Sequence, residues 1–503
     1  MRRRIWRRRI RDGISGLGMA LALALSACGG GSSGGSSSPV TVTPTPTPTP
    51  TPTAGCSLRM RQDWVLAQFN EWYLFPETMT YVPPSGFSNL SDYVDALTAG
   101  ARAQGKDRYF SYVTSIAAEN AYYASGSTGG FGMRLYVDDA ARRLWVSEAF
   151  ENAPALNAGI DRGAEILSIG ASSTSMRTVS AILASEGQYG LYVALGADTP
   201  NVTRVLQIRD AAGTRNVTVT KADFNIDAVS PRYGMKVLTD SGRKVGYINL
   251  RTFISPAVPA LRTAFASFKA QGIDEVIIDL RYNGGGAISV AQVLASLLGG
   301  ARRSSDIFAT LKFRPEKSVE NTPYYFQSES SAIAPRRIAF LGTRSTASAS
   351  ELVINGMRPY LRADIALIGD NTYGKPVGQI ALDITSNASL AAQGCSDDRL
   401  RLIAFATVNA DGDGGYYNGL GTVMEQTCRA RDDLQYPLGD IGDDMVARAV
   451  DFLDKRACTP ISGSGVGQFG IVSADRSVPI ESALEPLIGD KPSPAQRDLP
   501  GLF

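Results

Sequence analysis

Two residues that could act together in nucleophilic catalysis lie close to each other in the second half of the chain. Ser348 stands among small residues in the segment STASASE (345–351), and Lys375 stands in TYGKPVGQ (372–379). A serine hydroxyl attacks a carbonyl carbon once an adjacent base removes its proton. A lysine amine can be that base if burial lowers its pKa, whereas an arginine cannot because it stays protonated.

Each segment also has a plain structural interpretation. Ser348 and Glu351 match the Ser-x-x-Glu capping box that begins many helices. A lysine in a Gly/Pro turn is usually a surface residue. The chain has only ten lysines against 40 arginines, however, so lysine is not its default cation.

A third segment, DLRYNGGG (279–286), leaves an apolar run and enters a glycine turn. Successive glycines let backbone N–H groups converge, so such a turn can bind an anion or a developing oxyanion. Glycine turns are common, so this segment indicates an oxyanion site only in combination with the other two segments.

Composition excludes several competing chemistries. The 503 residues contain no histidine, which removes Ser-His-Asp and Cys-His catalysis and histidine-ligated zinc or haem. The net charge of +2 gives no reason to expect a nucleic-acid partner. No cofactor or metal is implied, and a lysine becomes the plausible base near neutral pH.

The elements that must position these segments read as an α/β domain over residues 227–458. Apolar runs at 244–250, 275–280, 337–341 and 365–368 predict strands, and 257–271 predicts an amphipathic helix. Such alternation predicts a mostly parallel sheet with its active residues at the strand ends.

The three segments together resemble the C-terminal processing peptidases, or tail-specific proteases, which are serine peptidases with a Ser-Lys dyad. The resemblance implies that Ser348 is the nucleophile, Lys375 its general base and Gln379 the residue that orients the lysine. It also implies an oxyanion hole from the N–H groups of Ala349 and of Gly285 or Gly286. Two departures stand out: Pro376 follows the lysine where the family often has glycine, and the 27-position interval from Ser348 to Lys375, which contains Pro359, is about two positions longer than the family pattern implies.

Residues 128–226 resemble a PDZ domain. Gly130, Phe131, Gly132 and Met133 match its peptide-binding loop, and Ala164 replaces an aspartate usual in the run that follows. The resemblance implies that a substrate's C-terminal tail adds to a sheet edge while backbone N–H groups hold its carboxylate. The expected partners are therefore proteins or peptides with accessible C-termini, and an adaptor protein is a further candidate.

The first 55 residues read as an export signal and a tether. Residues 1–12 carry seven arginines and one aspartate, a net +6, so the remainder stands at −4 against the whole-chain +2. A short apolar run and the sequence LSAC resemble a bacterial lipobox, which predicts a signal peptide over 1–27 and lipidation of Cys28. Gly/Ser and Thr-Pro sequence over 28–55 predicts a spacer. We therefore expect a lipid-anchored protein of the bacterial cell envelope that faces the periplasm, with the outer membrane as the favoured location.

Four further cysteines, Cys56, Cys395, Cys428 and Cys458, predict two disulfides in an exported chain. Three pairings satisfy this count. The pairing expected here joins Cys395 to Cys428 and Cys56 to Cys458.

The whole chain thus reads as a multidomain α+β and α/β protein. A helical region is expected over 56–127, with helices near 64–74, 90–103 and 109–123, and a tail over 459–503. Two alternatives stay open: a catalytically silent relative that binds peptides, and a calcium-dependent protein suggested by NADGDG (409–414). The second lacks the glutamate expected at position 12 of a calcium loop.

Overall fold

The computed structural model describes residues 55–461, 484–489 and 492–503. The predicted signal peptide, the lipidation residue Cys28 and nearly all of the predicted spacer lie outside these ranges. Within them, no helix combines the length and the apolar character needed to cross a bilayer.

The predicted α/β domain is built on a six-stranded sheet. Its order is β10 (Met235–Asp240), β11 (Arg243–Asn249), β12 (Glu275–Asp279), β15 (Arg337–Gly342), β16 (Ile365–Gly369) and β19 (Thr427–Arg429). All neighbours are parallel except β10 and β11. The central strands β12, β15 and β16 are buried and have apolar middle residues, because helices cover both faces of the sheet.

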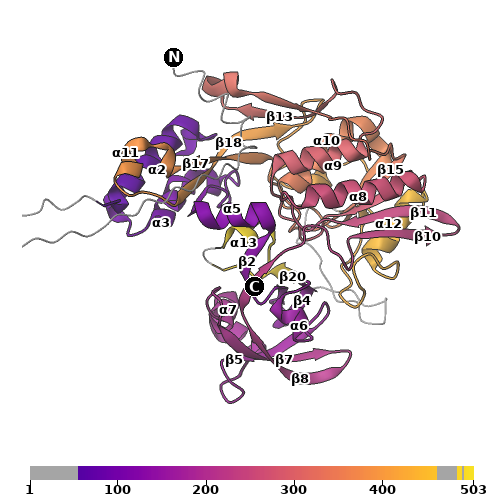
Figure 1. The fold of residues 1–503 in the computed structure, drawn as a ribbon, viewed down its shortest axis with the longest axis horizontal. Helices are drawn as coiled ribbons and strands as arrows, with labels where there is room; N and C mark the ends of the chain where they lie inside the picture. The colour runs from indigo at the N-terminus through magenta and orange to yellow at the C-terminus, as the bar shows by residue number, and fades with distance from the viewer. Residues whose placement is uncertain (1–54, 462–483, 490–491) are drawn as a thin grey trace, which may run out of the picture. The chain divides into compact units, whose positions relative to one another are not determined.

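The alternation of side chains along β12 shows the two covered faces. Val276 and Ile278 pack with α8 (Ala257–Ala270), α9 (Ile288–Leu298) and α10 (Ala349–Leu361), while Ile277 packs with α12 (Asp444–Leu453). Figure 1 shows α8, α9 and α10 side by side next to this sheet. The fold class predicted from the sequence is confirmed.

A second sheet, of five strands, carries the N-terminal helices. The strands are β1 (Tyr112–Ser115), β18 (Asp398–Val408), β13 (Ile307–Phe313), β14 (Thr322–Tyr325) and β17 (Val377–Asp383). Helices α2 (Leu58–Trp72), α3 (Leu90–Leu97) and α4 (Ala99–Ala103) precede β1, and aromatic residues of α2 pack on β18.

The helix predicted near residues 109–123 is confirmed only in its second half. Residues 112–115 form β1, which pairs with residues 398–401 of β18, and the helix α5 (Ile116–Ser125) begins only after it. Helical periodicity in the sequence could not reveal this pairing, because the partner strand lies almost 300 positions away.

A small β domain, residues 127–225, follows α5. Its main sheet has the order β20 (Leu484–Pro486), β3 (Met133–Asp138), β4 (Arg143–Ala149), β5 (Glu165–Gly170), β7 (Thr203–Asp210) and β8 (Gly213–Thr220). The remaining elements are β2 (Ser127–Gly130), α6 (Pro154–Asn157), β6 (Arg177–Thr178), α7 (Val179–Leu195) and β9 (Ala222–Asn225). One strand, β20, comes from the predicted tail.

The described part of that tail is folded against the rest of the chain. The short helix α13 (Pro494–Asp498) follows β20, and Leu499, Leu502 and Phe503 are buried. This packing could not be predicted from the sequence, because the segment is short, is rich in Gly, Ser and Pro, and packs on residues more than 200 positions away.

Residues 409–414, which suggested a calcium loop, form a polar turn after β18. The Asn409 side-chain oxygen accepts the N–H groups of Asp411 and Asp413. The Asp411 carboxylate pairs with Arg362 at 2.7 Å. Across residues 55–461, 484–489 and 492–503, no group of three or more acidic, cysteine or histidine residues is placed to hold a metal ion.

Two disulfides are present, as predicted, but the expected pairing is wrong. Cys56 joins Cys395, and Cys428 joins Cys458. Residue 56 precedes α2, which packs on β18, so it lies near Cys395 just before that strand. The order of the cysteines in the sequence carries no such information.

Peptide mapping without reduction should recover these two pairs. Replacing Cys56 and Cys395 together by serine is expected to lower the free energy of unfolding by about 2–5 kcal/mol, because the bond restricts the unfolded chain. Urea unfolding of the oxidised protein and of this variant measures the difference. A peptide that links Cys395 to Cys428 would contradict the assignment.

Candidate active site

Ser348 lies at the junction between β15 and α10, immediately before the first helical residue, Ala349. Its backbone angles are φ 55° and ψ −114°, a conformation that residues other than glycine rarely adopt. Strain of this kind is kept only where the surroundings enforce it, and it is typical of functional sites. The N-terminal end of α10 also places its partial positive charge beside the serine.

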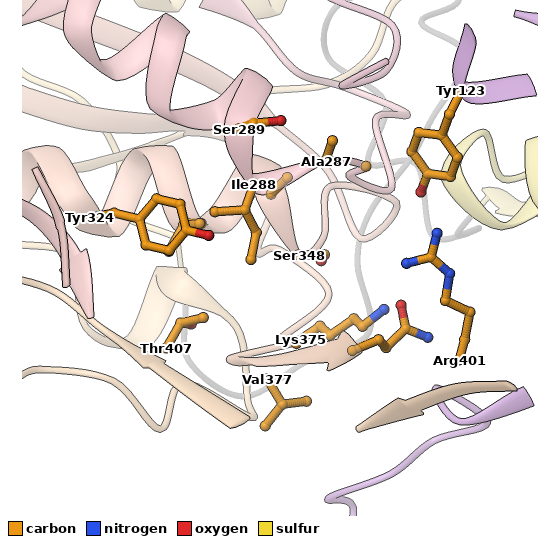
Figure 2. Close-up of a pocket in the computed structure, with 15 residues that line it drawn as sticks. Tyr123, Ala287, Ile288, Ser289, Tyr324, Ser348, Lys375, Val377, Arg401 and Thr407 are labelled. Atoms are coloured by element: carbon orange, nitrogen blue, oxygen red, sulfur yellow. The ribbon is translucent and has the colours of Figure 1, made fainter. Parts of the chain in front are cut away.

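Ser348 and Lys375 line one pocket of about 310 Å³. Lys375 belongs to the loop between β16 and β17, so both residues follow strands of the six-stranded sheet, as the sequence predicted. Figure 2 shows both in the middle of the pocket, with Tyr324 and Ile288 on one side and Arg401 and Tyr123 on the other.

The environment of Lys375 favours a neutral amine. Burial lowers the pKa of Lys375 to about 8, against the opposing attraction of Asp498 and Asp107. Its Nζ lies 4.9 Å from the centre of the Phe110 ring. At this pKa roughly a tenth of the amine is unprotonated at pH 7, and that fraction can act as a general base.

Glu351 joins the serine segment to the lysine loop. Its buried carboxylate accepts the N–H of Ser348 at 3.0 Å, the N–H groups of Gly374 and Lys375 at 2.7 Å each, and the hydroxyl of Thr372 at 2.6 Å. Burial raises the pKa of Glu351, and these four donors oppose the rise. The sequence identified Glu351 only as half of a capping box, since contacts with residues 372–375 depend on the tertiary fold.

Gln379 lies on β17 and lines the same pocket. Its amide nitrogen donates to the carbonyl oxygen of Phe110, the residue whose ring faces the lysine amine. The structure therefore places Gln379 beside Lys375, with its amide group fixed by the backbone before β1.

The glycine turn packs directly on the serine. A Cβ built on Gly285 would approach the Ser348 Cβ to 2.8 Å and the Ala349 nitrogen to 3.0 Å, so a side chain does not fit there. The N–H of Ala347 and the hydroxyl of Ser350 both donate to the Asn283 carbonyl at 3.0 Å. These bonds hold the turn in register with the start of α10.

The two candidate glycines differ in what their N–H groups do. The Gly285 N–H donates to the side-chain oxygen of Asn283 at 2.9 Å. Gly286 lines the pocket, and within the described residues no backbone hydrogen bond uses its N–H or that of Ala349. Gly286 and Ala349 are therefore better placed than Gly285 to bind an oxyanion.

The predicted peptide-binding loop lies at the end of β2 and the start of β3. Phe131 is buried in the small β domain, and the N–H groups of Gly132 and Met133, at the start of β3, donate to the Phe503 carbonyl oxygen. The next residue, Arg134, pairs with Glu148 at 3.0 Å and donates to the carbonyl of Tyr282 at 2.6 Å. The buried hydrogen bond from Arg134 to Tyr282 connects the small β domain to the glycine turn.

Comparison with known proteins agrees with this geometry. Residues 244–395 match the model of Peptidase family S41. The C-terminal processing peptidase, chloroplastic, of Tetradesmus obliquus is 27% identical over 53% of this chain and 55% of its own length. The carboxyl-terminal-processing protease of a Synechocystis species is 26% identical over 53% of this chain and 57% of its own. The chain thus spans just over half the length of these relatives.

The fold has a counterpart among solved structures. A crystal structure described as an S41 protease from Bacteroides fragilis aligns with a TM-score of 0.59 and 22% identity, over 78% of this chain and 97% of that one. At this identity the likeness concerns the fold alone. Residues 244–395 therefore match Peptidase family S41, and the chain is similar over about half of its length to carboxyl-terminal processing proteases.

Proposed function

We propose that this protein is a serine endopeptidase that cleaves protein substrates with a Ser348–Lys375 dyad. The observation that carries the proposal is the shared pocket, in which a strained serine at a helix start meets a lysine whose pKa is lowered to about 8. Glu351 positions both backbones, and Gln379 lies beside the lysine.

The chemistry follows from these positions. The neutral amine of Lys375 takes the Ser348 proton, and the oxygen attacks the peptide carbonyl carbon. The carbonyl electron pair moves to its oxygen, which accepts the N–H groups of Ala349 and Gly286. Collapse expels the amine product, which takes the proton from Lys375. Water then gives a proton to Lys375 and hydrolyses the ester, and Ser348 regains its proton.

The pocket suggests which side chain precedes the cleaved bond. Its walls beside Ser348 include Ile288, Leu352, Val377 and Tyr324. An apolar side chain of moderate size suits such walls, because its transfer from water is favourable.

The edge of β3 and the loop at Gly130–Met133 suit a bound peptide tail, so we also propose that the small β domain recognises substrates by their C-termini. Strand addition supplies backbone hydrogen bonds, and paired N–H groups suit a carboxylate. Anchoring through lipidated Cys28 and a periplasmic location remain part of the proposal, on the basis of the first 28 residues alone.

Covalent labelling tests the proposal. A biotinylated alkyl fluorophosphonate should modify Ser348, with the site mapped by mass spectrometry, and a peptide with a free apolar C-terminus should be cleaved. Ser289 lines the same pocket, so Ser289→Ala is a matched control that should keep labelling. A protein that binds the peptide without labelling or cleavage would be the catalytically silent relative.

The pH dependence of cleavage should report the lysine. Only the neutral amine can act as a base, so kcat/KM is expected to rise with pH and then level off. The midpoint of the rise should lie near the Lys375 pKa of about 8. The Asp498 charge raises that pKa, so Asp498→Asn should move the midpoint to lower pH. Initial rates from about pH 6 to about pH 9 measure both curves. A flat profile would contradict the role of Lys375.

A further inference from the structure

The edge of β3, where a substrate tail would bind, is occupied by residues of the same chain. The Phe503 carbonyl oxygen accepts the N–H of Gly132 at 2.7 Å and of Met133 at 3.2 Å, and the Phe503 N–H donates to the Met133 carbonyl at 2.9 Å. The Leu135 N–H donates to the Gly501 carbonyl at 2.7 Å. Residues 501–503 thus extend the sheet as an added strand, with the Phe503 carbonyl where a peptide carboxylate is expected.

The side chains of this segment are buried in two different cores. Phe503, 1% exposed, packs in the core of the small β domain, with its ring centre 6.1 Å from that of Tyr192 on α7. Leu499 and Leu502 pack instead in the core of the six-stranded sheet. The segment therefore fills an apolar pocket between β3 and α7 and joins the small β domain to the catalytic one.

The segment also reaches the candidate active site. The Asp498 carbonyl accepts the Gly284 N–H at 2.8 Å, and the Tyr123 hydroxyl donates to the Asp498 carboxylate at 3.1 Å. A Cβ on Gly284 would approach the Arg497 carbonyl oxygen to 2.8 Å. Tyr123 lines the catalytic pocket, so these residues lie against the glycine turn and the pocket wall.

We propose that residues 499–503 are a built-in ligand of the β3 edge, which a substrate tail must displace before it can be bound. The inference rests on the proposed role of the small β domain and adds two claims to it. The resting protein has a closed peptide groove, and the groove selects tails with a large apolar residue at the position that Phe503 occupies.

The expected size of the effect follows from competition. If the groove is free for only a small fraction of the time, the apparent dissociation constant of a peptide equals the intrinsic constant divided by that fraction. Opening it should therefore strengthen binding by roughly 10- to 100-fold. An active protein with an open groove would bind more substrate at a given concentration, so kcat/KM should rise in the same variant.

Gly501 allows the segment to be displaced without change to the groove. Its φ is +85°, and a Cβ there would approach the Leu135 carbonyl oxygen to 2.8 Å. Gly501→Val should therefore expel residues 501–503. Gly86→Val is the matched control, because a Cβ on Gly86 meets nothing within 4 Å.

The probe is a fluorescent decapeptide with the sequence of residues 494–503, PAQRDLPGLF, and a free carboxylate. Anisotropy is measured with full-length protein in a Ser348→Ala background, so that the probe is not cleaved. Gly501→Val should bind it at least about tenfold more tightly than the parent and Gly86→Val. The amidated probe and a probe that ends in alanine should bind Gly501→Val more weakly.

A second measurement on the Ser348→Ala parent, in which Gly501 is unchanged, covers a Gly501→Val variant that fails to fold. Excess probe should increase hydrogen exchange in residues 499–503, because the Phe503 N–H loses the Met133 carbonyl. Equal probe affinity in parent and Gly501→Val, or unchanged exchange at saturating probe, would overturn the inference. Neither readout requires cleavage, so a protein that shows both effects but hydrolyses nothing would refute only the proposed peptidase activity.

Discussion

Replacing Ser348 by alanine is expected to abolish cleavage, and replacing Lys375 by alanine should lower kcat by roughly 10²–10⁴-fold. The first change removes the nucleophile and the second removes the group that takes its proton. Neither should unfold the protein, since Ser348 and Lys375 are both partly exposed at the pocket. Initial rates and thermal melting of each purified variant measure the two effects.

The double variant sharpens this prediction. Groups that act as one unit are not additive, so Ser348→Ala with Lys375→Ala should be no slower than Ser348→Ala alone. Lys375→Arg keeps the positive charge but cannot deprotonate, and it should be as inactive as Lys375→Ala. Near-full activity in either lysine variant would contradict the dyad.

Replacing Glu351 by alanine is expected to reduce stability and activity together. The change leaves three backbone N–H groups and the Thr372 hydroxyl without their acceptor. Each buried donor left unpaired costs about 1–3 kcal/mol, so the free energy of unfolding should fall by at least about 3 kcal/mol. Urea unfolding measures this loss.

Activity separates positioning from simple instability. Glu351 holds the backbones of Ser348 and Lys375, so the Glu351→Gln variant, assayed below its melting temperature, should lose kcat and change KM little. Glu425→Ala is the control, because Glu425 is exposed at the surface and its loss should change stability by no more than about 0.5 kcal/mol. A Glu351→Gln protein with normal kcat would contradict the positioning role.

Local sequence was sufficient to predict that the segments of the candidate site lie at one edge of the sheet. The segments 279–286, 345–351 and 372–379 each follow a strand of the parallel sheet. These strands can be predicted from short runs of apolar residues in the sequence. Parallel strands bring their carboxyl ends to one edge, so the three segments had to converge there. The direction of the Lys375 pKa shift was also predictable, because a lysine that lines such a pocket loses part of its contact with water.

Other features required residues that are far apart in the sequence. The disulfide from Cys56 to Cys395 depends on α2 packing against β18, and the strand β1 exists only because β18 offers it an edge. The assignment of Gly286 rather than Gly285 to the oxyanion hole depends on Asn283, because its side-chain oxygen already accepts the Gly285 N–H.

The sequence by itself determined which residues can react: a serine, a lysine and a glycine turn, in a chain without histidine. Only the tertiary structure decided that Glu351 ties the serine to the lysine, and that residues 499–503 lie on the edge of β3. The reason is physical. Residue type and short-range periodicity set chemical capacity and local structure, whereas the partner of a buried carboxylate or of a sheet edge is chosen by packing among distant segments.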